Sequence, residues 1–81
     1  MITKIIEIIA EIKEEPSLIN KLNESSDLTH DAGMDSLNII NFILRIEEEF
    51  DIEVDFDHFS LEHLQSVQKF SQFIREMAAS V

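Results

Sequence analysis

The chain has 81 residues, of which seventeen are acidic and six are basic, and its formal net charge is −11 with neutral histidines. A chain of this length forms one domain over residues 1–81, and so acidic a surface repels nucleic acid and anionic membranes, so we expect neither as a partner. It contains no cysteine, which excludes disulfides and zinc–thiolate sites and fits a reducing compartment.

Residues 3–15 are predicted to form the first helix, with Thr3 as its N-cap. Pro16 ends this helix because a proline pushes the residue before it out of helical geometry. Glu7 and Glu11 interrupt the apolar residues, so we expect neither a signal peptide nor a membrane span. The apolar face of the helix consists of isoleucines at helical spacing: Ile2, Ile5, Ile6, Ile8, Ile9 and Ile12.

Residues 16–34 show no sustained periodicity and are rich in polar residues, so they are predicted to form a long loop. Its expected apolar anchors are Leu18, Ile19, Leu22 and Leu28.

The second helix is predicted to begin at Asp35 or Ser36 and to run to about Phe50. Its core stripe comprises Ile39, Phe42, Ile43, Ile46 and Phe50. Its hydrated face comprises Asn38, Asn41, Arg45 and Glu48. A third group, Leu37, Ile40 and Leu44, lies on the flank nearer Ser36. The apolar arc is therefore wider than a core requires, and its excess borders the serine.

Residues 51–64 are ambiguous, because apolar residues alternate with acids at positions 52–56 as they would in a strand. A lone short strand has nothing to pair with, so we predict a loop and then a short helix near residues 57–64. The expected core of this helix comprises Phe56, Phe59, Leu61 and Leu64. Ser66 is predicted to cap a last helix, whose apolar residues are Val67, Phe70, Phe73, Ile74 and Met77. The predicted fold is all-α, with three main helices, a short third helix and a long first loop.

Ser36 is the clearest candidate for a functional side chain, because its hydroxyl is predicted to lie at a helix N-terminus, three residues after Gly33. A serine in this place is usually a helix cap, with Asp35 favoured by the helix dipole. We do not expect the nucleophile of a catalytic triad, since no strand precedes the serine and the G-x-S-x-G elbow is absent. We therefore expect no catalytic residue.

Residues 31–37, DAGMDSL, resemble the D-L-G-x-D-S-L motif of acyl and peptidyl carrier proteins. Residues 46–54, IEEEFDIEV, resemble the L-E-E-E-F-x-x-x-I that ends the second helix of that family, and helix order and length also agree. The resemblance implies a cytoplasmic, monomeric, non-enzymatic four-helix carrier. It also implies that Ser36 carries covalent 4′-phosphopantetheine, with Gly33, Asp35 and Leu37 shaping the cofactor site.

The resemblance further implies three kinds of partner: a phosphopantetheinyl transferase, an adenylating enzyme that loads acyl or aminoacyl groups, and downstream acyl-processing enzymes. The residues expected to face them are Met34, Leu37, Ile40, Leu44, Glu47 and Glu48. Without the resemblance, Glu47 and Glu48 would be interpreted as solvated residues at the end of a helix, and Leu37, Ile40 and Leu44 as residues at the periphery of the core.

Several positions depart from the housekeeping carriers of fatty-acid synthesis. Ala32 replaces a leucine, and Asn38, Asn41 and Arg45 make the face beside the serine less acidic. Residues 57–67 resemble the D-x-L-x-L-E-N-F-x-S-I pattern of stand-alone carriers in specialised polyketide or nonribosomal pathways. These features favour a specialised carrier, and a general fatty-acid carrier is the alternative.

The alternative from another class is an unmodified acidic helical module, such as an EF-hand-like calcium binder. Residues 51–62 carry acids at several of the ligand positions of an EF-hand loop. Phe56, however, occupies the sixth position, where the sharp turn of that loop requires glycine. We therefore expect no metal site.

Overall fold

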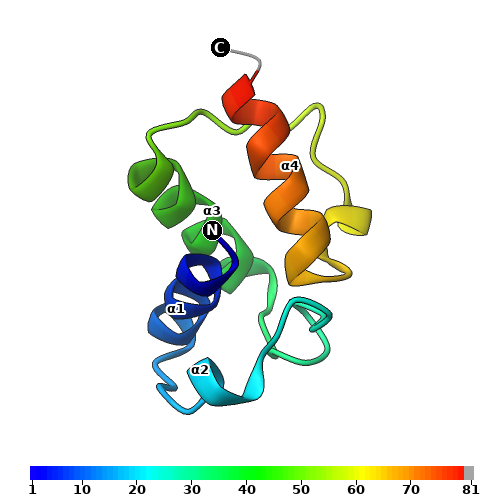
Figure 1. Ribbon diagram of the computed structural model, residues 1–81. Coiled ribbons are helices and arrows are strands. Elements are labelled where there is room, and N and C mark those ends of the chain that lie inside the picture. The colour runs from blue at the N-terminus through cyan, green and yellow to red at the C-terminus, as the bar shows by residue number, and fades with distance from the viewer. Residues whose placement is uncertain (80–81) are drawn as a thin grey trace.

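The computed structural model describes residues 1–79, which form helices and loops and contain no strand (Figure 1). The long helices are α1 (Ile2–Lys13), α3 (Ser36–Phe50) and α4 (Val67–Ala79). The short ones are α2 (Leu18–Lys21) and the 3-10 helix η1 (Leu61–Leu64). The all-α prediction is confirmed.

The core lies where the three long helices meet. α1 packs against both α3 and α4, and its buried face is made of isoleucines and Ala10. Phe42 of α3 and Phe70 of α4 are fully buried, and their ring centroids are 5.0 Å apart. The predicted stripe of α3 is confirmed, with Phe42, Ile43 and Ile46 buried and Ile39 and Phe50 packed at its edge. Burial of these apolar side chains is the main source of stability.

The first helix differs from the prediction at both ends. It begins at Ile2 after Met1, and Thr3 lies exposed inside it, so the prediction of Thr3 as the N-cap is wrong. It ends at Lys13 because Glu14 adopts the left-handed conformation, with φ 54°, and its amide donates to the carbonyls of Ala10 and Glu11. The chain therefore leaves the helix before Pro16 can act on it.

The long first loop contains a helical turn, α2, that periodicity did not reveal. Three of its predicted anchors, Leu18, Leu22 and Leu28, are buried, but Ile19 is exposed, so that part of the prediction is wrong. A single turn is too short for a hydrophobic pattern to show it.

Backbone hydrogen bonds fasten this loop to the second half of the chain. The amide of Leu28 donates to the carbonyl of Leu64 in η1, at 3.0 Å. The amide of Val67, at the start of α4, donates to the carbonyl of Ser26, at 2.9 Å. The loop that leads to α3 is thereby held against η1 and α4.

The short third helix is smaller than predicted, because η1 covers Leu61–Leu64 only. Leu64 is buried and Phe59 is partly buried, whereas Phe56 and Leu61 are exposed, so the predicted core is wrong for these two. The alternating residues 52–56 form no strand. Ser66 caps α4 as predicted, and its Oγ accepts from the amide of Lys69 at 3.0 Å.

Within residues 1–79, no helix has both the length and the apolar character that a membrane crossing requires.

Candidate functional site

Ser36 is the first residue of α3, and its side chain is exposed. The cap of the helix is Asp35, whose Oδ1 accepts from the amide of Asn38 at 2.8 Å. Asn38 reciprocates, because its Oδ1 accepts from the amide of Asp35 at 3.2 Å. This capping box fixes the start of α3 without Ser36, so the serine hydroxyl is not needed to cap the helix.

The first amides of α3 and α4 differ in what they bind. In α4, Val67 and Gln68 donate to carbonyls of the first loop, and Lys69 donates to the side chain of Ser66. In α3, the amides of Ser36 and Leu37 have no intrahelical acceptor, and no hydrogen bond joins them to another residue of the range 1–79. The end of α3 therefore has two donors and the positive end of the helix dipole available to an anion.

Gly33 sets the path of the chain into α3. It has φ 73°, a conformation that residues with a Cβ rarely adopt. A Cβ built there would meet nothing closer than Lys13 Nζ at 4.0 Å, so backbone conformation, and not space, requires glycine. Lys13 Nζ donates to the carbonyl of Gly33 at 3.0 Å and ties the end of α1 to this turn.

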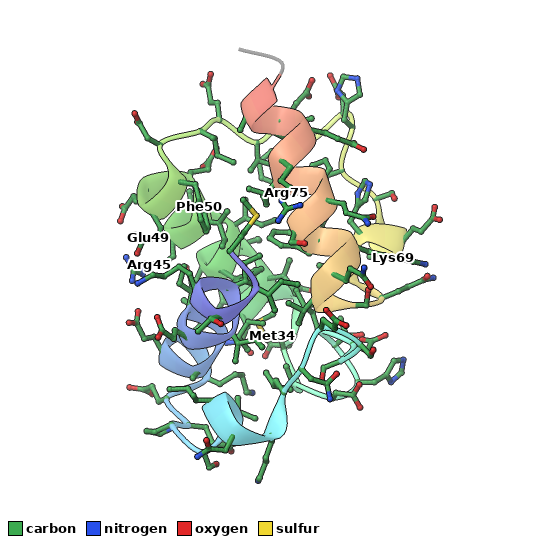
Figure 2. The ribbon with its side chains drawn as sticks, in the orientation of Figure 1. Met34, Arg45, Glu49, Phe50, Lys69 and Arg75 are labelled. Atoms are coloured by element: carbon green, nitrogen blue, oxygen red, sulfur yellow. The ribbon has the colours of Figure 1, made fainter. Side chains whose placement is uncertain are left out.

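Met34 was predicted to contact partners, and the structure corrects this prediction. Its side chain is only 4% exposed and points into the molecule (Figure 2), and its amide donates to the carbonyl of Leu28 at 3.3 Å. Met34 is thus a core residue that anchors the segment before Ser36. Ala32 is buried too, so this position still packs, although with a smaller side chain than leucine.

The turn after α2 is organised by Asp27. Its Oδ1 accepts from the amide and the hydroxyl of Thr29, both at 2.7 Å, and from the amide of His30 at 2.9 Å. Partial burial raises the pKa of Asp27, but the hydrogen bonds from His30 and Thr29 together outweigh it, so the net pKa lies below its usual value. The ionised carboxylate is therefore favoured in the folded state.

We expect Asp27→Asn to lower the melting temperature at pH 7. A depressed folded-state pKa contributes stability above the unfolded-state value of 3.8, and this contribution is lost as the pH falls through the folded-state pKa. The difference from wild type should therefore shrink below pH 3.8, as followed by circular dichroism melts. Asp57→Asn is the matched control, because Asp57 is exposed. An equal loss in both variants would contradict the role of the Asp27 turn.

Three apolar side chains follow one another along the outer surface of α3. Leu37, Ile40 and Leu44 are 66%, 53% and 53% exposed. Their spacing of three and four residues places them on one face of the helix, which begins beside Ser36. The structure thus presents these predicted partner-facing residues to solvent as one row, which we call the apolar row.

The two predicted partner-facing glutamates differ from one another. The side chain of Glu48 is 75% exposed. Glu47 is half-buried, and its Oε2 accepts from the amide of Val54 at 2.8 Å, which holds the loop after α3. Glu48 is therefore accessible to a partner, although Arg45 Nη1 lies 3.7 Å from its Oε2, whereas Glu47 has a structural role that the sequence did not reveal.

The acids of residues 51–62 do not converge on one point. Asp51 ends α3 in the left-handed conformation, with φ 52°. Asp55 accepts from the amide of Asp57 at 2.9 Å and pairs with His58 Nδ1 at 2.7 Å. In the part of the chain that the structure describes, no three acidic or histidine side chains are grouped so as to hold a metal ion.

Residues 3–74 match the family model described as a phosphopantetheine attachment site. The chain is 39% identical to the acyl carrier protein of Caulobacter vibrioides (strain NA1000 / CB15N) over 59 residues, which cover 73% of each chain. It is 40% identical to the acyl carrier protein of Buchnera aphidicola subsp. Schizaphis graminum over 73 residues, which cover 90% of this chain and 84% of the relative. No solved structure matches the chain.

Acyl carrier proteins are not enzymes, and they interact with phosphopantetheinyl transferases and acyl-processing enzymes. The family match covers both the turn at Gly33 and the helix that Ser36 begins. The chain therefore belongs to the acyl carrier protein family and is a carrier with a covalently attached 4′-phosphopantetheine.

Proposed function

We propose that Ser36 is the attachment residue and that the protein presents acyl or aminoacyl groups to partner enzymes from this position. The observation that carries the proposal is the exposed, unpaired hydroxyl of Ser36 beside two free amides at the start of α3. It is supported by the match of the surrounding residues to the motif of the family.

The residues around Ser36 suit the group chemically. A phosphodiester on Ser36 Oγ would lie at the positive end of α3, where the amides of Ser36 and Leu37 favour an anion. The Asp35–Asn38 capping box holds that helix end in place. When bound, the group supplies a terminal thiol that holds the cargo as a thioester, which explains how a chain without cysteine takes part in thiol chemistry.

Incubation with coenzyme A, magnesium and a promiscuous phosphopantetheinyl transferase should add the mass of one phosphopantetheine to the protein. Intact-mass spectrometry reads the result directly. A chain that stays unmodified under saturating transferase contradicts the proposal.

We further propose a dedicated cytoplasmic role in a specialised pathway, with an adenylating enzyme as the loading partner. Asn41 and Arg45 support it, since Asn41 lies exposed on α3 where fatty-acid carriers usually show acids or other polar groups, and Arg45 adds a positive charge to the same face. Asn38 is weaker support for a specialised role. Its side-chain Oδ1 completes the capping box, so the fold itself gives a reason for asparagine at this position. The names of the relatives leave the general fatty-acid carrier as the alternative.

The specialised role and the general fatty-acid role predict different rates of elongation by chain-elongating synthases. We expect the modified protein to be elongated at least about tenfold more slowly than a housekeeping carrier, because a difference of ~1.4 kcal/mol in recognition corresponds to tenfold. The measurement is a side-by-side elongation assay, with a panel of adenylating enzymes as the second arm. Equal elongation would favour the fatty-acid role.

A further inference from the structure

A second row, made of polar and charged side chains, runs along α3 beside the apolar row. It follows the same helical spacing of three and four residues, and Asn41, Arg45 and Glu48 of this row line a groove beside α1. Its members are Asn38, Asn41, Arg45 and Glu48. Arg45 therefore places a positive charge on the surface of α3 beside the apolar row.

Arg45 joins two helices through its guanidinium. Its Nη2 lies 2.7 Å from Glu11 Oε2 on α1, and its Nη1 lies 3.7 Å from Glu48 Oε2, one turn further along α3. The hydrogen bond to Glu11 and the charges of the nearby glutamates raise the pKa of Arg45 above its usual value. Figure 2 shows Arg45 at the outer edge of the molecule.

These charges border an open groove of about 450 Å³ between α1 and α3. Ile12 and Leu44 contribute its apolar side chains, and Glu14 adds a third acid beside Glu11 and Glu48. Leu44 belongs to both the groove and the apolar row, so an enzyme that docks on that row also reaches these charges.

The glutamates that a basic enzyme surface would reach are therefore already in contact with a cation of the protein itself. A lysine or arginine of a partner can bind Glu48 or Glu11 only in competition with Arg45. Exposed ion pairs are weak, so Arg45 reduces such binding by a small factor and does not prevent it. An enzyme that relies on apolar contacts with α3 does not meet this competition.

We propose that Arg45 is a specificity-determining residue, which engages Glu11 and Glu48 and so disfavours enzymes that dock on α3 through lysine or arginine. The preferred partner then recognises α3 mainly through Leu37, Ile40 and Leu44. The inference rests on the proposed function, since it concerns the enzymes that must reach Ser36.

The test is Arg45→Met, which removes the charge and keeps a long apolar side chain. The probe is a phosphopantetheinyl transferase with a basic carrier-binding surface, and the readout is kcat/KM for modification. We expect a rise of about two- to fivefold at ~0.01 M salt, the range that an exposed ion pair supports. The rise should vanish near 1 M salt, where the Debye length is about 3 Å.

Lys4→Met is the matched control. It removes the same charge from another exposed ion pair, Lys4–Glu7 at 3.3 Å, and Lys4 lies on α1 about 10 Å along the axis from Glu11. An equal rise in both variants would assign the effect to net charge and overturn the proposal, and so would an unchanged rate in Arg45→Met. A rise that persists at high salt would point to the new methionine surface and would also overturn it.

A double-mutant cycle tests whether Arg45 acts through Glu48. In the Glu48→Gln background, Arg45→Met should raise the rate by a smaller factor than in the wild type. An equal factor in both backgrounds would contradict the competition. The outcome is separable from the proposed function: a failed proposed function leaves the variants unmodified or modified at a residue other than Ser36, whereas a failed inference leaves them modified on Ser36 with no gain specific to Arg45→Met.

Discussion

Ser36→Ala is expected to abolish attachment of phosphopantetheine completely while the helices stay intact. The substitution removes the one oxygen that would form the phosphodiester. It costs little stability, because the cap of α3 is Asp35 and not Ser36, and exposed substitutions away from such features stay within about 0.5 kcal/mol. Intact mass after incubation with transferase and coenzyme A measures attachment, and circular dichroism measures the fold.

Ser66→Ala is the matched control for this experiment. Ser66 Oγ caps α4 by accepting from the amide of Lys69, so its loss should cost about 1 kcal/mol of stability. The expected pattern is thus reciprocal: one variant is unmodified and stable, and the other is modified normally and melts earlier. Attachment that persists in Ser36→Ala would move the site to another residue.

Periodicity was sufficient to predict the long helices, because each buries one face. The spacing of Phe42, Ile43 and Ile46 predicted the inner side of α3, and all three are buried. The same pattern showed more apolar residues than a core needs. The structure places the excess, Leu37 among it, on the surface.

The short elements were predicted less well than the long ones, because tertiary contacts stabilise them: α2 was not predicted, and η1 is shorter than the helix predicted for residues 57–64. α2 and η1 are single turns, too short for a hydrophobic period to be recognised. The bond from the Leu28 amide to the Leu64 carbonyl joins residues far apart in the chain. No local pattern encodes such a bond. Phe56 and Leu61 were misplaced for the same reason, since their burial depends on where the loop runs.

The candidate site likewise contains some features that the sequence predicts and others that only the fold reveals. A local motif identifies Ser36, Gly33 and Asp35, because a turn and a helix start are properties of adjacent residues. The residues that hold the site in place are distant: Lys13 reaches Gly33 across 20 positions, and Arg45 reaches Glu11 across 34. Their side chains are common on any helix surface, so only the fold reveals their partners.

The largest loss of stability is expected from Phe42→Ala. Phe42 is fully buried and meets Phe70 at a centroid distance of 5.0 Å, the contact that joins α3 to α4. Truncation of a buried phenylalanine costs about 3–5 kcal/mol. A chain of this size has a stability of only about 4–12 kcal/mol. We therefore expect the melting temperature to fall by more than about 12 °C.

Phe56→Ala is the matched control, since the same change at a side chain that is 60% exposed should cost far less. The two variants also test how the site depends on the fold. The free amides and the exposed hydroxyl of Ser36 exist together only while α3 is helical. Modification of Phe42→Ala should therefore decline over the temperature range in which its circular dichroism declines, while Phe56→Ala is modified like the wild type. Modification of Phe42→Ala at the full rate above its melting temperature would show that the transferase reads the motif as an unfolded segment, independently of α3.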